Sequence, residues 1–144
     1  MGVYKKILLA VDFSEYTEAL CEHAAKLSQA FNATVNYIHV VEPVFMDMPH
    51  EILPAESYEL ERDLFEHAQV RLLELADQYG LNEQQVHVAS GSSKTEILRF
   101  AEDQNIDLIM VGSHGRHGIA LLLGSTANAV LHGAPCDVLA VKVK

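Results

Sequence analysis

Positively charged residues are scarce in this chain of 144 residues, which has 10 Lys and Arg against 20 Asp and Glu and a formal net charge of −10. A surface of this sign repels the phosphates of nucleic acids, so direct binding of DNA or RNA is not expected. A bound nucleotide would have to be held by local hydrogen-bond donors, because the overall field of the protein acts against its phosphates.

Cysteine and long apolar runs are also scarce. Cys21 and Cys136 lie in separate apolar segments without a C-x-x-C spacing, which is typical of buried free thiols in a reducing compartment. No apolar run approaches the roughly 20 residues of a membrane-spanning helix, and no signal-peptide pattern is present. Lys6 stands where an N-myristoylation signal requires Ser or Thr. We therefore expect one cytoplasmic domain over residues 1–144, without membrane contact.

Several motifs of nucleotide-dependent and hydrolytic enzymes are missing. The chain has no Gly-Lys-Ser/Thr of a Walker loop, no G-x-G-x-x-G after its first predicted strand and no G-x-S-x-G nucleophile elbow. His114 and His117 are three residues apart, but no further set of zinc ligands accompanies them. We expect no metal site and no dedicated enzyme, with slow ATP hydrolysis as the most that a binding site would add.

Short apolar segments alternate with amphipathic ones along the chain, which is typical of α/β proteins with a parallel sheet. Buried strands are predicted at residues 4–11, 34–41, 86–89, 108–111 and 138–143. Helices are predicted at residues 15–31, 57–79, 94–104 and 125–131. Right-handed crossovers between such strands predict a doubly wound, five-stranded parallel sheet of order 3-2-1-4-5.

Local signals predict how the helices begin and which faces they bury. Ser14 is the predicted N-cap of the first helix, and Ser93 and Glu96 form the predicted capping box of the third. The second helix has an apolar stripe that is predicted to face the core, composed of Leu60, Leu64, Ala68, Leu72, Leu75 and Ala76. Residues 42–55 contain three prolines and form a long, apolar loop that is expected to pack over a neighbouring surface.

A glycine-rich segment follows the fourth predicted strand, with Gly112 and Gly115 at its start and Gly124-Ser125-Thr126 where the last helix begins. A strand, a glycine loop and a helix start together provide free backbone N–H groups and the positive end of a helix dipole, which suit a phosphate. In the predicted strand order the first and fourth strands are neighbours at the point of reversal. We therefore expect residues 12–14 and 112–126 to meet in one cleft.

Each candidate residue also has an explanation that needs no ligand. The glycines fit simple turns, and Asp12 can accept a hydrogen bond either from a ribose hydroxyl or from N–H groups at the start of the first helix. Ser125 and Thr126 can serve a phosphate or cap the last helix, and Arg116 either pairs with phosphate oxygens or stays solvated. His39 is expected to be a hydrogen-bonded core residue of the second strand.

Five segments resemble the universal stress protein family, and they follow the family's order across nearly the whole chain. They are residues 6–14, 38–41, 88–91, 107–115 and 134–141. The resemblance implies a Rossmann-like fold of the adenine nucleotide alpha hydrolase-like type. It also implies a cytoplasmic, homodimeric protein of the bacterial stress response, in a family of which some members bind ATP and others do not.

In the ATP-binding branch of that family, the ends of the first two strands contact the nucleoside and the glycine motif wraps the ribose and phosphates. The residues at or beside the matching positions are Ala10, Asp12, Ser14, Val40, Val41, Gly112, His114, Gly115, Arg116, Gly124, Ser125 and Thr126. Eight residues separate Gly115 from Gly124, one fewer than in the family pattern. The cofactor implied is ATP or another adenine nucleotide, which Mg²⁺ can accompany.

The sequence is compatible with three functions. The leading hypothesis is a regulatory module in which a bound nucleotide orders the glycine loop and changes a surface that an unknown partner protein contacts. The second is a ligand-free dimeric stress protein that acts through protein contacts alone. For both, the resemblance implies a homodimer through the last strand, with Val138, Leu139 and Val141, which the topology leaves at an edge of the sheet. The third is an ATP-consuming enzyme.

Overall fold

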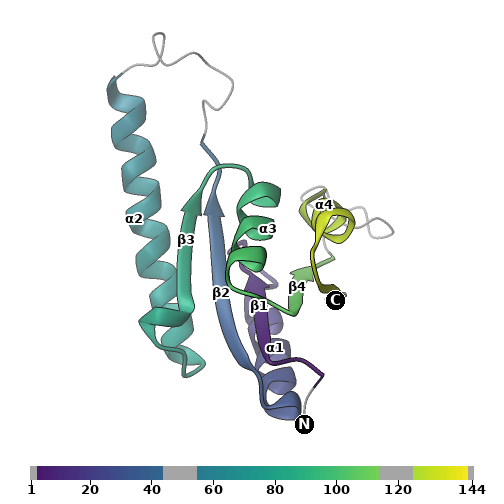
Figure 1. Ribbon diagram of the computed structural model, residues 1–144. Helices are drawn as coiled ribbons and strands as arrows, with labels where there is room; N and C mark the ends of the chain where they lie inside the picture. The colour runs from purple at the N-terminus through teal and green to yellow at the C-terminus, as the bar shows by residue number, and fades with distance from the viewer. Residues whose placement is uncertain (1–2, 44–54, 114–124, 143–144) are drawn as a thin grey trace.

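The computed structural model describes residues 3–43, 55–113 and 125–142 (Figure 1). Its elements are β1 (Lys6–Ala10), α1 (Thr17–Phe31), β2 (Thr34–Val41), α2 (Ala55–Gln78), a 3-10 turn (Glu83–Gln85), β3 (Val86–Ser90), α3 (Ser93–Asp103), β4 (Leu108–Gly112), α4 (Ser125–Gly133) and β5 (Asp137–Val141). All strand pairs are parallel, in the order β3-β2-β1-β4-β5. The predicted α/β class and strand order are therefore confirmed.

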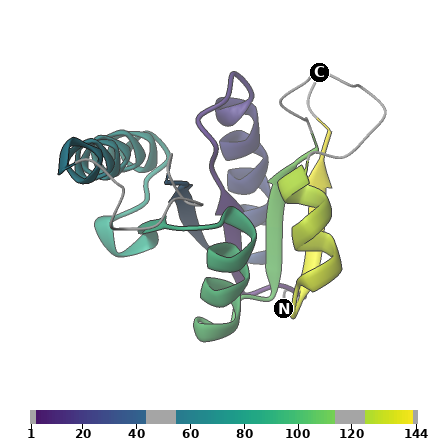
Figure 2. The same ribbon diagram turned by 90° about the horizontal axis from the view of Figure 1, so that it is seen from above.

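Helices cover both faces of this sheet, as the view from above shows (Figure 2). Leu20 of α1 and Leu72 of α2 belong to the core on one face, whereas Ile97 of α3 and Val130 of α4 belong to the core on the other. The central strands β1 and β4 contribute side chains to both cores. Their sequences are continuous apolar runs because neither face of these strands meets water.

The start of α1 differs from the prediction. The N-cap is Tyr16, not Ser14, and the helix begins at Thr17. Ser14 instead closes the turn that precedes the helix. Its Oγ accepts a hydrogen bond from the Tyr16 N–H at 3.2 Å, and its carbonyl oxygen accepts from the Thr17 hydroxyl at 2.8 Å. Ser14 thus organises residues that lie before the first helical turn, close to the carboxyl end of the central strand β1.

The predicted capping box of α3 is also wrong. Ser92 is the N-cap and makes no side-chain capping bond, while Glu96 pairs with Arg99 at 3.0 Å one turn further on. The N–H of Ser93 donates to Oε1 of Glu42, at 3.2 Å, from the end of β2. An acceptor 51 residues away in the chain thus satisfies the helix start, and local sequence patterns cannot indicate it.

Only the C-terminal half of α2 covers the sheet, since its N-terminal half extends past the carboxyl end of β3 (Figure 1). Ala68, Leu72 and Ala76 are buried as predicted, but Leu60 and Leu64 are 46% and 40% exposed. The apolar stripe continues along the helix where the sheet beneath it has ended. No helix in the described parts of the chain is long and apolar enough to cross a membrane.

Candidate functional site

A cavity of about 690 Å³ opens where the carboxyl ends of β1 and β4 lie side by side. The chain leaves β1 toward a helix on one face of the sheet and leaves β4 toward a helix on the other, so the connections diverge here and leave a crevice. The cavity lies between the ends of β1, β2 and β4 and the starts of α3 and α4. Its volume is in the range of small-molecule sites in proteins.

Every predicted binding residue that the structure describes lines this cavity. These residues are Ala10, Asp12, Ser14, Val40, Val41, Gly112, Ser125 and Thr126. The other four, His114, Gly115, Arg116 and Gly124, lie outside the described residues. The two segments that were expected to meet, residues 12–14 and the described part of 112–126, therefore do so, while their role in binding stays a prediction.

The turn that carries Asp12 has a defined internal geometry. Oδ1 of Asp12 accepts a hydrogen bond from the Ser14 N–H at 3.0 Å, and the N–H of Val11 donates to the Ile38 carbonyl at 2.8 Å. The second bond continues the pairing of the first two strands to the edge of the cavity. Asp12 is thus presented on a turn that is anchored to the sheet on one side and to the start of α1 on the other.

Sequence reasoning missed His39 as a lining residue, although it predicted the hydrogen bond of this side chain. Nδ1 of His39 lies 2.6 Å from the Val11 carbonyl oxygen, which can only accept, so Nδ1 carries the proton. Burial lowers the pKa of His39, so the ring is neutral at pH 7. Its position could have indicated the site, because it lies two residues before the end of β2, the neighbour of β1.

The described lining of the cavity is acidic. Asp12, Glu15 and Glu42 contribute carboxylates, and the lining residues that the structure describes include no Lys or Arg. Carboxylates suit hydroxyl and amino donors, such as those of a nucleoside. The start of α4 offers the hydroxyls of Ser125 and Thr126 together with helical N–H groups, which suit an anion. Within residues 3–43, 55–113 and 125–142, no His, Cys, Asp and Glu side chains gather as a metal site.

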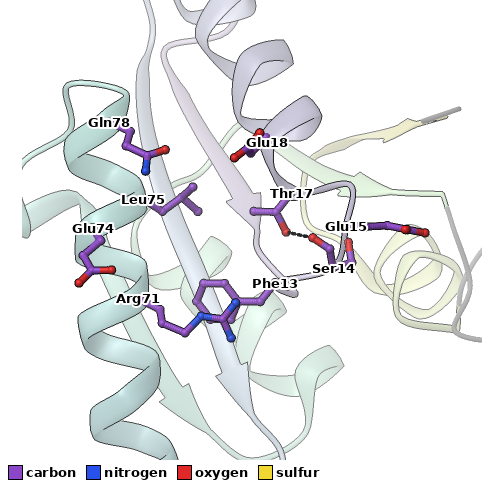
Figure 3. Close-up of a pocket in the computed structure, with 9 residues that line it drawn as sticks. All are labelled: Phe13, Ser14, Glu15, Thr17, Glu18, Arg71, Glu74, Leu75 and Gln78. Carbon is purple, nitrogen blue, oxygen red and sulfur yellow. Dashed lines mark hydrogen bonds between the residues drawn. The ribbon is translucent and has the colours of Figure 1, made fainter.

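A second cavity, of about 460 Å³, lies beside the same turn, between the start of α1 and the C-terminal third of α2 (Figure 3). Its lining residues are Phe13, Ser14, Glu15, Thr17, Glu18, Arg71, Glu74, Leu75 and Gln78. Cζ of Arg71 lies 4.2 Å from the centre of the Phe13 ring, within the range of a cation–π contact. Ser14 and Glu15 line both cavities, so the turn before α1 separates them.

Comparisons with known proteins agree on one family. The family whose sequence model matches is the universal stress protein family, over residues 3–142. Universal stress protein A homolog 2 of Coxiella burnetii is 44% identical over 145 residues, which cover 100% of this chain and 99% of that protein. The solved structure of the universal stress protein UspA from Lactobacillus plantarum has a TM-score of 0.80 at 25% identity, with 98% of both chains covered. A solved universal stress protein in complex with cAMP has a TM-score of 0.61 at 22% identity, with 96% of both chains covered, which shows a shared fold.

Proposed function

The chain belongs to the universal stress protein family, and from this premise we propose that it is an adenine-nucleotide-binding regulatory protein of the cytoplasm. One observation supports the proposal above the others. Residues from the ends of β1, β2 and β4 and from the start of α4, far apart in the sequence, line a single cavity of about 690 Å³. A solved protein of the same fold binds cAMP, so the fold is compatible with an adenine nucleotide.

The nucleoside would lie toward β1 and β2. Val40 and Val41 offer apolar surface and backbone groups to a base, and the carboxylate of Asp12 can accept from ribose hydroxyls. Asp12 already accepts from the Ser14 N–H through one oxygen. A carboxylate has about four acceptor positions on its two oxygens, so Asp12 can accept from more than one donor at a time.

The phosphates would lie toward α4, a helix of nine residues that begins at Ser125. The first N–H groups of a helix have no partner within the helix, and the aligned peptide dipoles favour negative charge there. The hydroxyls of Ser125 and Thr126 add two donors at the same place. Neutral donors of this kind can hold a phosphate without Lys or Arg side chains, which are scarce in this protein: its carboxylates outnumber its cations two to one.

A thermal-shift and calorimetric titration with ATP, AMP, adenosine and GTP, each with and without Mg²⁺, tests the proposal. A nucleotide at 100 times its Kd stabilises a protein by about 2.7 kcal/mol, which raises the Tm of a domain of this size by roughly 5–10 °C. We expect this shift with an adenine nucleotide. No change in Tm at millimolar ATP with Mg²⁺ would rule the function out.

Two isosteric variants locate the ligand. Asp12→Asn keeps an oxygen for the Ser14 N–H but removes the charge, so we expect about tenfold weaker binding of ATP and adenosine alike. Thr126→Val removes one hydroxyl at the start of α4 and should weaken ATP more than adenosine. Asp103→Asn, an exposed change at the end of α3, is the charge-matched control and should bind as the wild type does.

A second candidate function is a ligand-free dimer that acts only through protein contacts. The acidic lining of the cavity favours it, as does the position of β5 at an edge of the sheet. The same titration separates the two functions. A protein that dimerises through β5 but shows no response to any nucleotide would support this second function.

A further inference from the structure

Three side chains form a continuous column from α2 to the candidate nucleotide site. Arg71 lies over the Phe13 ring at 4.2 Å, and the rings of Phe13 and His39 follow with centroids 4.4 Å apart and planes 46° to each other. His39 then reaches the Val11 carbonyl oxygen at 2.6 Å. Arg71 and Phe13 line the smaller cavity (Figure 3), whereas His39 lines the larger one. The column therefore connects the two cavities through the turn between them.

The backbone of Phe13 is in an unusual conformation for its residue type. Its φ is +56°, in the left-handed region, where a bulky side chain is strained. The other described non-glycine residues with positive φ are Asn32 and Asn105, of a type that tolerates this region. Such strain persists only where surrounding contacts hold it, and it often marks functional sites. The ring of Phe13 packs against the core on one face of the sheet, and its two ring contacts at the turn are the ring of His39 and the guanidinium of Arg71.

The strained residue sits in the middle of the turn that presents Asp12. Its two neighbours are joined by the bond from the Ser14 N–H to Oδ1 of Asp12. A change of φ at Phe13 would rotate the peptide groups on both sides and move the carboxylate relative to the cavity. The contacts that hold Phe13 therefore also set the position of Asp12.

We propose that Arg71 and His39 are positioning residues for the nucleotide site, because their stacking on Phe13 holds the turn that aims Asp12 into the cavity. This inference rests on the proposed function. It gives α2 a role in binding although no residue of α2 lines the larger cavity. It also means that whatever moves Arg71 in the smaller cavity changes the affinity of the larger one.

The first test measures ATP affinity in variants of Arg71. Arg71→Leu keeps aliphatic contact and removes the cation, and we expect about two- to fivefold weaker ATP binding, the effect of one exposed cation–π contact. Arg71→Lys restores a cation and should recover most of the affinity. Arg62→Leu, an exposed arginine of α2 that lines neither cavity, is the matched control and should have no effect. Unchanged affinity in Arg71→Leu would overturn the inference while leaving the proposed function intact.

A double-mutant cycle shows whether Arg71 acts through Phe13. Phe13→Gly accepts the left-handed backbone but lacks the ring, so it should weaken ATP binding while the protein stays folded. In that background Arg71→Leu should cause no further loss. Full additivity of the two changes would overturn the inference, because Arg71 would then act by another route.

A third measurement needs no nucleotide. Burial lowers the pKa of His39, the hydrogen bond to the Val11 carbonyl and the nearby Asp12 carboxylate raise it, and the Arg71 cation lowers it. In an NMR titration of the free protein, Arg71→Leu should therefore raise the pKa of His39, whereas Arg71→Lys and Arg62→Leu should not. An unchanged pKa would show that the column is not formed. If the pKa of His39 rises in Arg71→Leu but the wild-type protein binds no nucleotide, the column exists and the proposed function fails. The positioning role then fails with it.

Discussion

At the scale of single residues, two half-buried histidines of the sheet, His39 and His87, have altered pKa values. Burial lowers the pKa of both His39 and His87. His39 bonds to the Val11 carbonyl, and Nε2 of His87 lies 3.3 Å from Oδ1 of Asn36. Each ring is therefore kept as a neutral hydrogen-bonding group, and both protonate more easily in the unfolded chain than in the folded one.

This difference predicts a loss of stability in mild acid. Because the folded pKa of each histidine is below the unfolded value of about 6.5, the unfolded chain binds more protons as the pH falls through that value. The free energy of unfolding should be highest above pH 6.5 and decline toward the folded pKa values. Urea unfolding between pH 7.5 and 5.5 measures it. The decline should be shallower in His39→Gln and His87→Gln, and an equal slope in all three proteins would contradict the explanation.

At the scale of elements, α1 and α3 end in the same way. An asparagine in the left-handed region follows each helix: Asn32, with φ 54°, caps α1, and Asn105, with φ 55°, comes after Gln104, the cap of α3. In each case the next residue donates its N–H back to a carbonyl five positions earlier, from Ala33 to Ser28 at 3.0 Å and from Ile106 to Ala101 at 2.9 Å. These bonds satisfy helix carbonyls and turn the chain directly into the next strand, which keeps the connections short.

The left-handed caps give a paired prediction. Asn32→Ala should lower the free energy of unfolding by about 1 kcal/mol, because alanine has the steric penalty of this region without the local hydrogen bonding of asparagine. Asn32→Gly should be neutral or slightly stabilising, since glycine has no Cβ. Chemical unfolding of both variants, repeated at Asn105, measures the difference. An alanine variant as stable as the glycine variant would show that the conformation is not strained.

At the scale of the whole molecule, the two edges of the sheet differ. In the described parts of the chain, β3 pairs with β2 and packs closely against α2, with which it shares a core, whereas β5 pairs with β4 and packs less closely against α4. The central residues of β5 are half-buried, including Val138 and Leu139. An edge strand with apolar side chains and free backbone groups favours pairing with another chain. A second copy of this protein, placed about a two-fold axis, would close that edge.

We therefore predict a homodimer through β5. Leu139→Lys should give monomers in size-exclusion chromatography with light scattering, because a charge would be buried at the interface. Leu139 is half-buried against the core, so circular dichroism of the same variant checks that the fold is kept. Val141 also belongs to the predicted interface, but it is only 9% exposed and packs in the core, so Val141→Lys would damage the fold as well. Val70→Lys on α2, where Val70 is 56% exposed, is the control. A dimer that survives Leu139→Lys but not Val70→Lys would place the interface on α2 instead.

The sequence by itself determined the class, the strand order and the position of the cleft. Continuous apolar runs and amphipathic helices are local patterns, and the right-handed crossover rule converts their order into a topology. The end of β1 at Asp12 and the end of β4 at Gly112 then had to be neighbours. The resemblance to a family then indicated which residues around this cleft would contact a nucleotide.

Only the tertiary structure decided features that depend on contacts between distant segments. The Glu42 carboxylate at the start of α3, the exposure of Leu60 and Leu64, and the column of Arg71, Phe13 and His39 are all of this kind. Local patterns report the preference of a segment for a helix or strand and the face that it buries. They contain no information on where a sheet ends beneath a helix or which side chain of another element reaches a turn, because packing geometry sets both.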